Sequence, residues 1–301
     1  MKKILCFAAL LLIQAQANAA LKIFACEPEW AALAQELGAG DVEVYSATSA
    51  LQDVHKIQPR PSLIAKYRQA DLVVCTGAEL ELAWLSPLAE KGNNPKVNPG
   101  ARGYFEASKF VKMLEVPERL DRSAGDVHPY GNPHVQTGPQ NIAPVARALA
   151  QKLAELDVAH SAGYQQRAAS FDQRWSAALE KWQARAKPLQ GVDVVSHHKT
   201  WVYLYDWLGV HEVTTLEPKP GIPPSGAHLE EILDTLKVHP AKMVVYAAYE
   251  DGHAAQWLSE HAHIPVVQLP FSVGGADGAP DLFGLYEVTL DRMLKALGGG
   301  S

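Results

Sequence analysis

Short apolar runs alternate with helix-like patterns along this chain, and the alternation predicts parallel α/β structure. The first half carries three strand-like runs, at residues 21–25, 41–46 and 71–75. Between the second and third runs, Pro61 stands where the first turn of a helix tolerates proline, and the apolar face of this helix continues to Ala70. His55 therefore falls in the loop that leads into a helix.

A second block of the same kind begins after Gly191. The strand-like VDVVSH is followed by the helix-like TWVYLYDWLG, which ends at Gly209. Three more strand-like runs follow, at residues 211–217, 242–249 and 265–270. The repeated pattern predicts a second α/β lobe.

Between the two blocks, apolar residues recur at spacings of three and four and predict one amphipathic helix of about 25 residues. The residues of this face are Tyr164, Ala168, Phe171, Trp175, Leu179, Trp182 and Ala186. A helix of this length spans about 40 Å and can join two lobes as a rigid spine. We predict an N-terminal lobe at residues 20–155, a linking helix at 156–188 and a C-terminal lobe at 189–301.

The N-terminus has the pattern of a secretory signal peptide at residues 1–19. Two lysines precede an apolar run at residues 4–13, and an A-x-A cleavage signal ends at Ala19. The run has about half the length that a membrane-spanning helix needs. Cys6 lies inside it, not at the cleavage point, so the sequence offers no acceptor for a lipid anchor. We expect a free periplasmic protein.

Composition narrows the choice of partners and of metal chemistry. The chain is 48% hydrophobic and 20% charged with a net charge of -6, which is typical of a globular protein and gives no basic surface for nucleic acid. After cleavage only Cys26 and Cys75 remain, so a cysteine-rich metal site is excluded. Each ends a strand-like run in an oxidising compartment, and both a disulfide and two separate buried thiols are consistent with that placement.

Three of the twelve histidines follow strands or lie in strand-to-helix loops: His55, His134 and His198. In parallel α/β folds such loops gather at the carboxyl edges of the sheets, where ligands bind. Each histidine alone is typical of a solvated loop, but together the three contexts indicate one metal site in a cleft between the lobes. Three neutral imidazoles favour zinc over manganese, which prefers more oxygen ligands.

Three motifs resemble the zinc and manganese receptors of ABC importers, the ZnuA- and TroA-like solute-binding proteins of cluster A-I. They are DVHKIQPRPSLIAKYRQADLVVCTGAELE, GNPHVQTGPQNI and HHKTWVYLYDWLGV, and the resemblance covers nearly the whole mature chain. It implies two Rossmann-like α/β lobes joined by a long rigid helix. It also implies a monomeric receptor that captures Zn(II), or alternatively Mn(II), through His55, His134 and His198 and delivers it to a membrane permease.

The fourth ligand departs from the family pattern. Many members have an aspartate after the last strand, where this chain has Pro270, which cannot coordinate a metal. Glu217 matches a glutamate that manganese-binding members use and is the first candidate. Asp277, in a glycine-rich loop, and a water molecule are the alternatives.

Other residues and functions compete with this interpretation. His128 is expected on the surface, or as a neighbour or alternative ligand of the site, and His197 is expected to point away from His198 on a strand. A periplasmic zinc hydrolase with Glu217 or Glu79 as general base is the enzymatic alternative, but the chain has no H-E-x-x-H or G-x-S-x-G motif. An adhesin is a further alternative. For a histidine site, metal affinity is expected to fall as the pH drops toward about 6.5.

Overall fold

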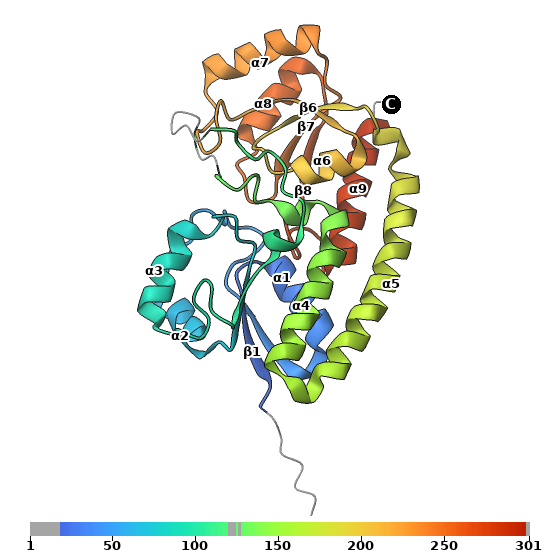
Figure 1. Cartoon of the computed structure of the whole chain (residues 1–301). Coiled ribbons are helices and arrows are strands. Elements are labelled where there is room, and N and C mark those ends of the chain that lie inside the picture. Colours follow the sequence, from blue (N-terminus) through green and yellow to red (C-terminus); the bar gives the residue numbers. More distant parts are fainter. Residues whose placement is uncertain (1–18, 120–124, 126–127, 299–301) are drawn as a thin grey trace, which may run out of the picture.

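The computed structural model describes residues 19–119, 125 and 128–298, so the predicted signal peptide lies outside the described residues except for Ala19. These residues form two lobes, each built on a parallel four-stranded sheet (Figure 1). The first sheet has the order β2-β1-β3-β4, with β1 at Leu21–Ala25, β2 at Val42–Ser46, β3 at Leu72–Cys75 and β4 at Tyr104–Glu106. The second has the order β6-β5-β7-β8, with β5 at Asp193–Ser196, β6 at His211–Thr215, β7 at Met243–Ala247 and β8 at Val266–Leu269.

Helices cover both sheets. Those of the first lobe are α1 (Pro28–Gly38), α2 (Pro61–Gln69), α3 (Leu82–Gly92) and α4 (Ile142–Leu156). Those of the second are α6 (Val202–Leu208), α7 (Gly226–Val238), α8 (His253–Ala262) and α9 (Leu282–Gly298). The predicted two-lobed α/β architecture is confirmed. The edge strand β4 was not predicted.

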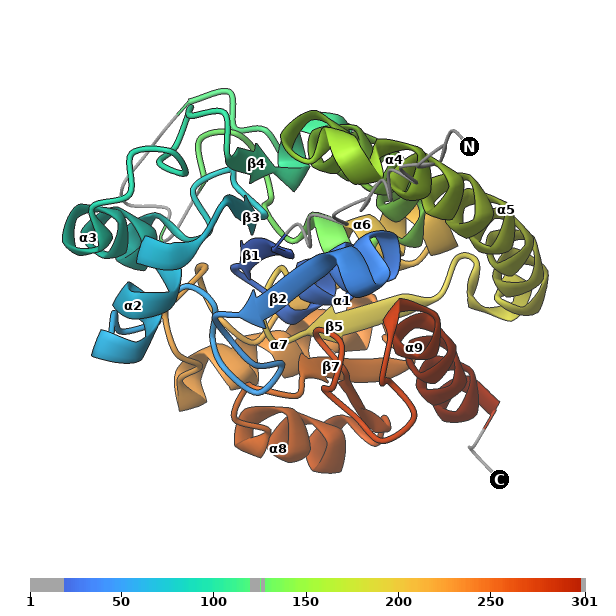
Figure 2. The ribbon, with the colours of Figure 1, turned by 90° about the horizontal axis from the view of Figure 1, so that it is seen from below.

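The long helix predicted between the lobes is α5, which spans 25 residues from Ser161 to Arg185. Seen from below, α4 and α5 lie along one side of the molecule, and α2 and α3 lie on the opposite side (Figure 2). Near its start, Arg167 pairs with Asp41 of the first lobe at 2.8 Å. Near its end, Arg185 pairs with Asp291 of α9 at 2.8 Å, so ion pairs fix both ends of α5.

One of the hydrophobic clusters of the described residues extends through both lobes. A single cluster of buried side chains contains Ile23 of β1, Trp175 and Trp182 of α5, and Met243 of β7. Each of these side chains is at most 2% exposed. Opening the lobes would expose part of this core to water, so the fold opposes a wide hinge motion.

A disulfide joins Cys26 and Cys75, whose Cα atoms lie 4.8 Å apart. The pairing follows from the sheet, because Cys26 comes directly after β1 and Cys75 ends the neighbouring strand β3. Among the described residues, no helix combines the length and the apolar character that crossing a membrane requires.

Candidate metal centre

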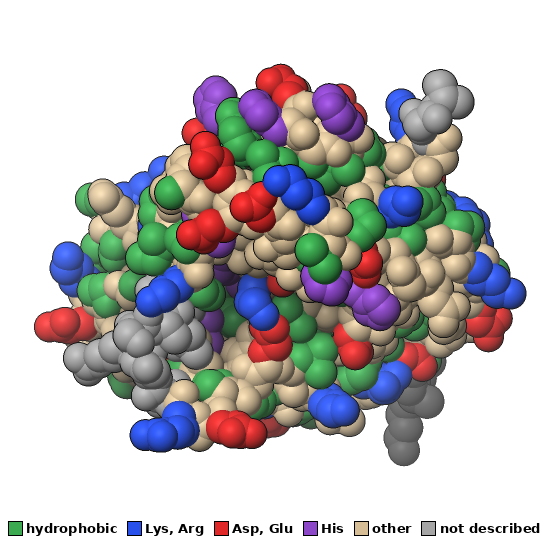
Figure 3. Space-filling model, turned by 90° about the horizontal axis from the view of Figure 1, so that it is seen from above, with side chains coloured by type: hydrophobic (Ala, Val, Ile, Leu, Met, Phe, Trp, Pro, Cys, Tyr) green, Lys and Arg blue, Asp and Glu red, His purple; other side chains and the backbone are tan. Residues whose placement is uncertain are grey.

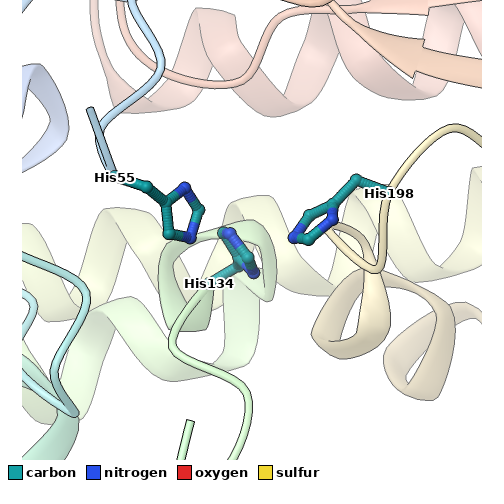
Figure 4. Close-up of side chains that lie close together, drawn as sticks. All are labelled: His55, His134 and His198. Carbon is teal, nitrogen blue, oxygen red and sulfur yellow. The ribbon is translucent and has the colours of Figure 1, made fainter. Parts of the chain in front are cut away.

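His55, His134 and His198 come together between the lobes, from three separate loops. His55 lies between β2 and α2, His134 precedes a short 3-10 turn, and His198 is the second residue after β5. Their rings face one another across a small space (Figure 4). Each ring offers one nitrogen, and these three nitrogens lie within 4.8 Å of one another. The arrangement could hold a metal ion.

At two of these histidines, an oxygen two residues earlier in the chain fixes the ring. The Oδ1 atom of Asp53 accepts hydrogen bonds from the backbone N–H and the Nδ1 of His55, at 3.0 and 2.9 Å. The Oδ1 atom of Asn132 does the same for His134, at 3.0 and 2.9 Å. Because a backbone N–H can only donate, the Oδ1 atom that it contacts is an acceptor. The Nδ1 atom that contacts the same oxygen therefore carries the proton. The Nε2 atoms remain available for a metal.

His198 is oriented by a carboxylate from further along the chain. The Oε2 atom of Glu217, just after β6, accepts a hydrogen bond from His198 Nδ1 at 2.7 Å and another from the backbone N–H of Gly221 at 2.9 Å. Burial lowers the pKa of His198, but the hydrogen bond and negative charge of Glu217 outweigh burial and raise this pKa overall. The same contact lowers the pKa of Glu217 against the raising effect of its burial.

His134 is the most deeply buried member of the group, with 1% of its surface exposed. Its Nε2 atom has no hydrogen-bond partner among the described residues. Burial, and then the neighbouring charges of His198, His55 and His128, hold the pKa of His134 well below its usual value. His134 therefore stays neutral at physiological pH, which is the form that binds metals. A buried, unpartnered nitrogen costs free energy unless something occupies it.

Two cavities flank the histidines. One, of about 180 Å³, is lined by His55 and His198 and by the acidic residues Asp53, Glu217, Glu250 and Asp251. The other, of about 300 Å³, is lined by His134 and His198 and by Glu115, His128 and Lys199. Seen from above, this face of the molecule is hollowed, and histidine side chains are visible inside the hollow (Figure 3).

The two side chains predicted as a fourth ligand, Glu217 and Asp277, do not lie on the face that the three rings share. Glu217 lies behind His198, because its Oε2 atom bonds the Nδ1 side of that ring. Asp277 is exposed in the loop after β8 and does not line either cavity. Among the described residues, the group that could hold a metal at this place contains only the three histidines.

Two further histidines lie closer to the site than their sequence context indicates. The His128 ring is 5.6 Å from the His55 ring, so His128 is a neighbour of the site. His197 lines the same cavity as His198, so the expectation that it points away was wrong. That expectation assumed a strand through both residues, whereas β5 already ends at Ser196.

Sequence reasoning missed three acidic or amide residues of the site: Asp53, Asn132 and Glu250. For the first two a signal was available, since both stand two residues before a candidate histidine. Glu250 follows β7 in the second lobe and lines the smaller cavity. Burial raises the pKa of Glu250 to about 8 against the opposing effects of a backbone hydrogen bond and of His198. Its place beside the histidines depends on the folded sheet.

Two α/β lobes that gather three histidines between their sheet edges have the architecture of a solute-binding receptor. A family model described as "Zinc-uptake complex component A periplasmic", ZnuA, matches residues 23–297. The chain belongs to this family. It is therefore a solute-binding receptor of a metal ABC transporter and not an enzyme, which excludes the hydrolase alternative.

Known relatives and structures are similar over most of the chain. The manganese ABC transporter substrate-binding lipoprotein PsaA of Streptococcus pneumoniae is 21% identical over 84% of this chain and 80% of its own. The iron-binding protein YfeA of Yersinia pestis is 26% identical over 86% of this chain and 81% of its own. The crystal structure of ZnuA superposes with a TM-score of 0.77 at 20% identity, covering 93% of this chain and 100% of that chain.

Proposed function

We propose that this protein is the periplasmic zinc receptor of an ABC importer. It captures Zn(II) with the Nε2 atoms of His55, His134 and His198 and delivers the ion to a membrane permease. The observation that carries the proposal is that an oxygen acceptor holds the Nδ1 atom of every one of the three rings. Each ring is thus fixed in one tautomer with the other nitrogen turned to a common space, as in known zinc sites.

The ligand chemistry favours zinc over manganese or iron. Zinc accepts three imidazoles and one further ligand in a tetrahedral site, whereas manganese prefers more oxygen ligands at six positions. The relatives named above include a manganese and an iron protein, and family membership alone is therefore compatible with several metals. The three-histidine set is the feature that selects zinc.

We assign Glu217 the role of a positioning residue for His198 in place of the fourth-ligand role that the resemblance implies. Its Oε2 atom already accepts two hydrogen bonds, from His198 Nδ1 and Gly221 N–H. A carboxylate in this place raises the basicity of the imidazole and orients its free nitrogen. The fourth position is then left to another ligand.

The decisive experiment is calorimetric titration of purified mature protein with zinc and with manganese, together with metal analysis of protein taken from the periplasm. We expect zinc in the isolated protein and loss of zinc binding in His55→Ala, His134→Ala and His198→Ala. His211→Ala is the matched control, because His211 is exposed and, within the described part of the chain, pairs with Asp193 away from the site. Unchanged zinc binding in all three variants would refute the site.

The manganese alternative predicts a different result. Manganese would then be the metal found in the periplasmic protein, and Glu217→Ala would abolish binding as completely as a histidine variant.

Export is tested on the same sample, since cleavage after Ala19 gives a mature N-terminus at Ala20. We expect this protein to elute as a monomer.

A further inference from the structure

Four acidic side chains line the smaller cavity beside the histidines: Asp53, Glu217, Glu250 and Asp251. Three of them are each bonded to the Nδ1 atom of a histidine, in the pairs Asp53 with His55, Glu217 with His198, and Asp251 with His253. Glu250 has no histidine partner among the described residues. Among the described residues, it is the acidic group of this cavity that no histidine ring accounts for.

Glu250 is held in place by the end of β7. Its Oε2 atom accepts a hydrogen bond from the backbone N–H of Ala247 at 2.5 Å. Within the described part of the chain it forms no ion pair, and the lysine that lines the same cavity, Lys56, pairs with Asp53 at 3.4 Å. A buried carboxyl group without a cation is favoured in its protonated form, and a positive charge beside it favours the carboxylate.

A cavity large enough for water molecules lies beside Glu250, His55 and His198. The three ring nitrogens lie within 4.8 Å of one another, and Glu250 is not part of that group. Glu250 lines the cavity of about 180 Å³ together with His55 and His198, so its carboxyl group and two of the three rings border one space. A water molecule between metal and carboxylate would bridge this separation without moving the backbone.

Resting on the proposed zinc site, we propose that Glu250 accepts a hydrogen bond from a water molecule that fills the fourth position on the metal. A water bound to Zn²⁺ is polarised and becomes a much stronger hydrogen-bond donor than bulk water. A carboxylate is the strongest acceptor available for it. Glu250 would also offset the charge of the ion in a site whose three direct protein ligands are neutral.

The test uses the mature protein, with zinc affinity measured by competition against a chromophoric chelator. Glu250→Gln keeps an oxygen for the Ala247 N–H but removes the charge, and we expect zinc affinity to fall about 10- to 100-fold. Glu250→Asp keeps the charge and should lose less. Asp251→Asn, one residue away in the same cavity, is the matched control and should change affinity less than about threefold, because Asp251 already bonds His253.

A second measurement distinguishes a bonded water from a general charge effect. In a crystal structure of the zinc-loaded protein, we expect a water on the metal within hydrogen-bond distance of Glu250. A direct bond between zinc and a Glu250 oxygen would overturn the proposal, as would equal zinc affinity in wild type and Glu250→Gln. His134→Ala separates the two proposals if Glu250→Gln binds zinc like the wild type. Normal zinc binding in His134→Ala as well would show that the three-histidine site is wrong. Loss of zinc binding in His134→Ala would refute only the role of Glu250.

Discussion

The rings of His55 and His134 are held by the same local hydrogen-bond pattern. In each case a side-chain oxygen two residues earlier accepts both the backbone N–H and the Nδ1 proton of the histidine. Asp251 and His253 repeat this geometry at the start of α8, where the histidine is exposed. This local hydrogen-bond pattern therefore fixes the tautomer of the histidine. The position of the loop in the fold decides whether the ring reaches the site.

Removing this acceptor should weaken metal binding. We expect Asp53→Ala to lower zinc affinity about 10- to 100-fold, because the His55 ring would lose its orientation and its tautomer. Asp53→Asn should retain most of the affinity, since Asn132 shows that an amide oxygen can fill the same role. Calorimetric titration measures both. Glu231→Ala, which removes the Nδ1 partner of His228 on α7, serves as control and should bind zinc like the wild type.

The acidic partner of His198 should determine how binding depends on pH. The pKa of His198 is raised, so as pH falls through that value the ring takes up a proton that zinc must displace. Apparent zinc affinity should then fall about tenfold per pH unit below the raised pKa, for each proton displaced.

Glu217→Gln tests this assignment. Without the negative charge the pKa of His198 drops, so the pH dependence should shift to lower pH while affinity at pH 8 weakens. The measurement is chelator competition between pH 5.5 and 8.5. An identical pH profile in wild type and Glu217→Gln would show that His198 is not the group that titrates.

At the scale of the elements, the disulfide between β1 and the end of β3 closes a loop of considerable length. The two cysteines are 49 residues apart in sequence, and both are completely buried. Replacing both by alanine should lower the free energy of unfolding by about 2–4 kcal/mol, mainly because the unfolded chain gains freedom. Thermal unfolding with and without reductant measures the effect. The double variant should be insensitive to reductant, and equal stability of both proteins would contradict the prediction.

The secondary structure could be predicted well where the chain carries a strong apolar pattern. The strand-like run at residues 21–25 coincides with β1, and the spacing of Tyr164, Phe171 and Trp175 anticipates α5. The strand β4 escaped prediction because it has three residues, of which only Phe105 is buried. Such a short edge strand has no periodicity to detect and is defined by its pairing with β3.

The candidate metal centre, too, could be predicted only in part from the sequence. The three histidines could be found from their loops, because the carboxyl ends of parallel strands meet at one edge. The position of Glu217 behind His198, and that of Glu250 across the cavity, result from the packing of β6 and β7 beside β5. No spacing in the sequence specifies those contacts, so the sequence offers Glu217 as a ligand candidate by its residue type and does not reveal its hydrogen bond to His198.

At the scale of the whole molecule, a buried carboxyl group links the two lobes. Ser272, after β8, donates a hydrogen bond to Glu29 of α1, and Glu27 and Glu81 lie in the same buried region of the first lobe. Burial raises the pKa of Glu29 to about 7 and that of Glu81 to about 7. The folded protein thus binds more protons than the unfolded chain between about pH 4.5 and 7.

Stability should therefore decrease as the pH rises through this window. At pH 8, Glu29→Gln should increase the free energy of unfolding by on the order of 2 kcal/mol, because it removes a buried charge. Its amide oxygen can still accept from Ser272. At pH 4.5 the variant and the wild type should be similar. Glu90→Gln, at an exposed position, should have no effect at either pH, and thermal unfolding across the pH range measures all three proteins.

The hydrophobic core that extends through both lobes has a consequence for the lifetime of the bound ion. Because separating the lobes would expose that core to water, we expect an ion held by three histidines to leave when an individual loop withdraws its ring. The loop that carries His55 has no helix or strand between β2 and α2, whereas His134 is buried. Dissociation should begin at His55, and a membrane partner that displaces this one loop could shorten the residence time without changing the fold.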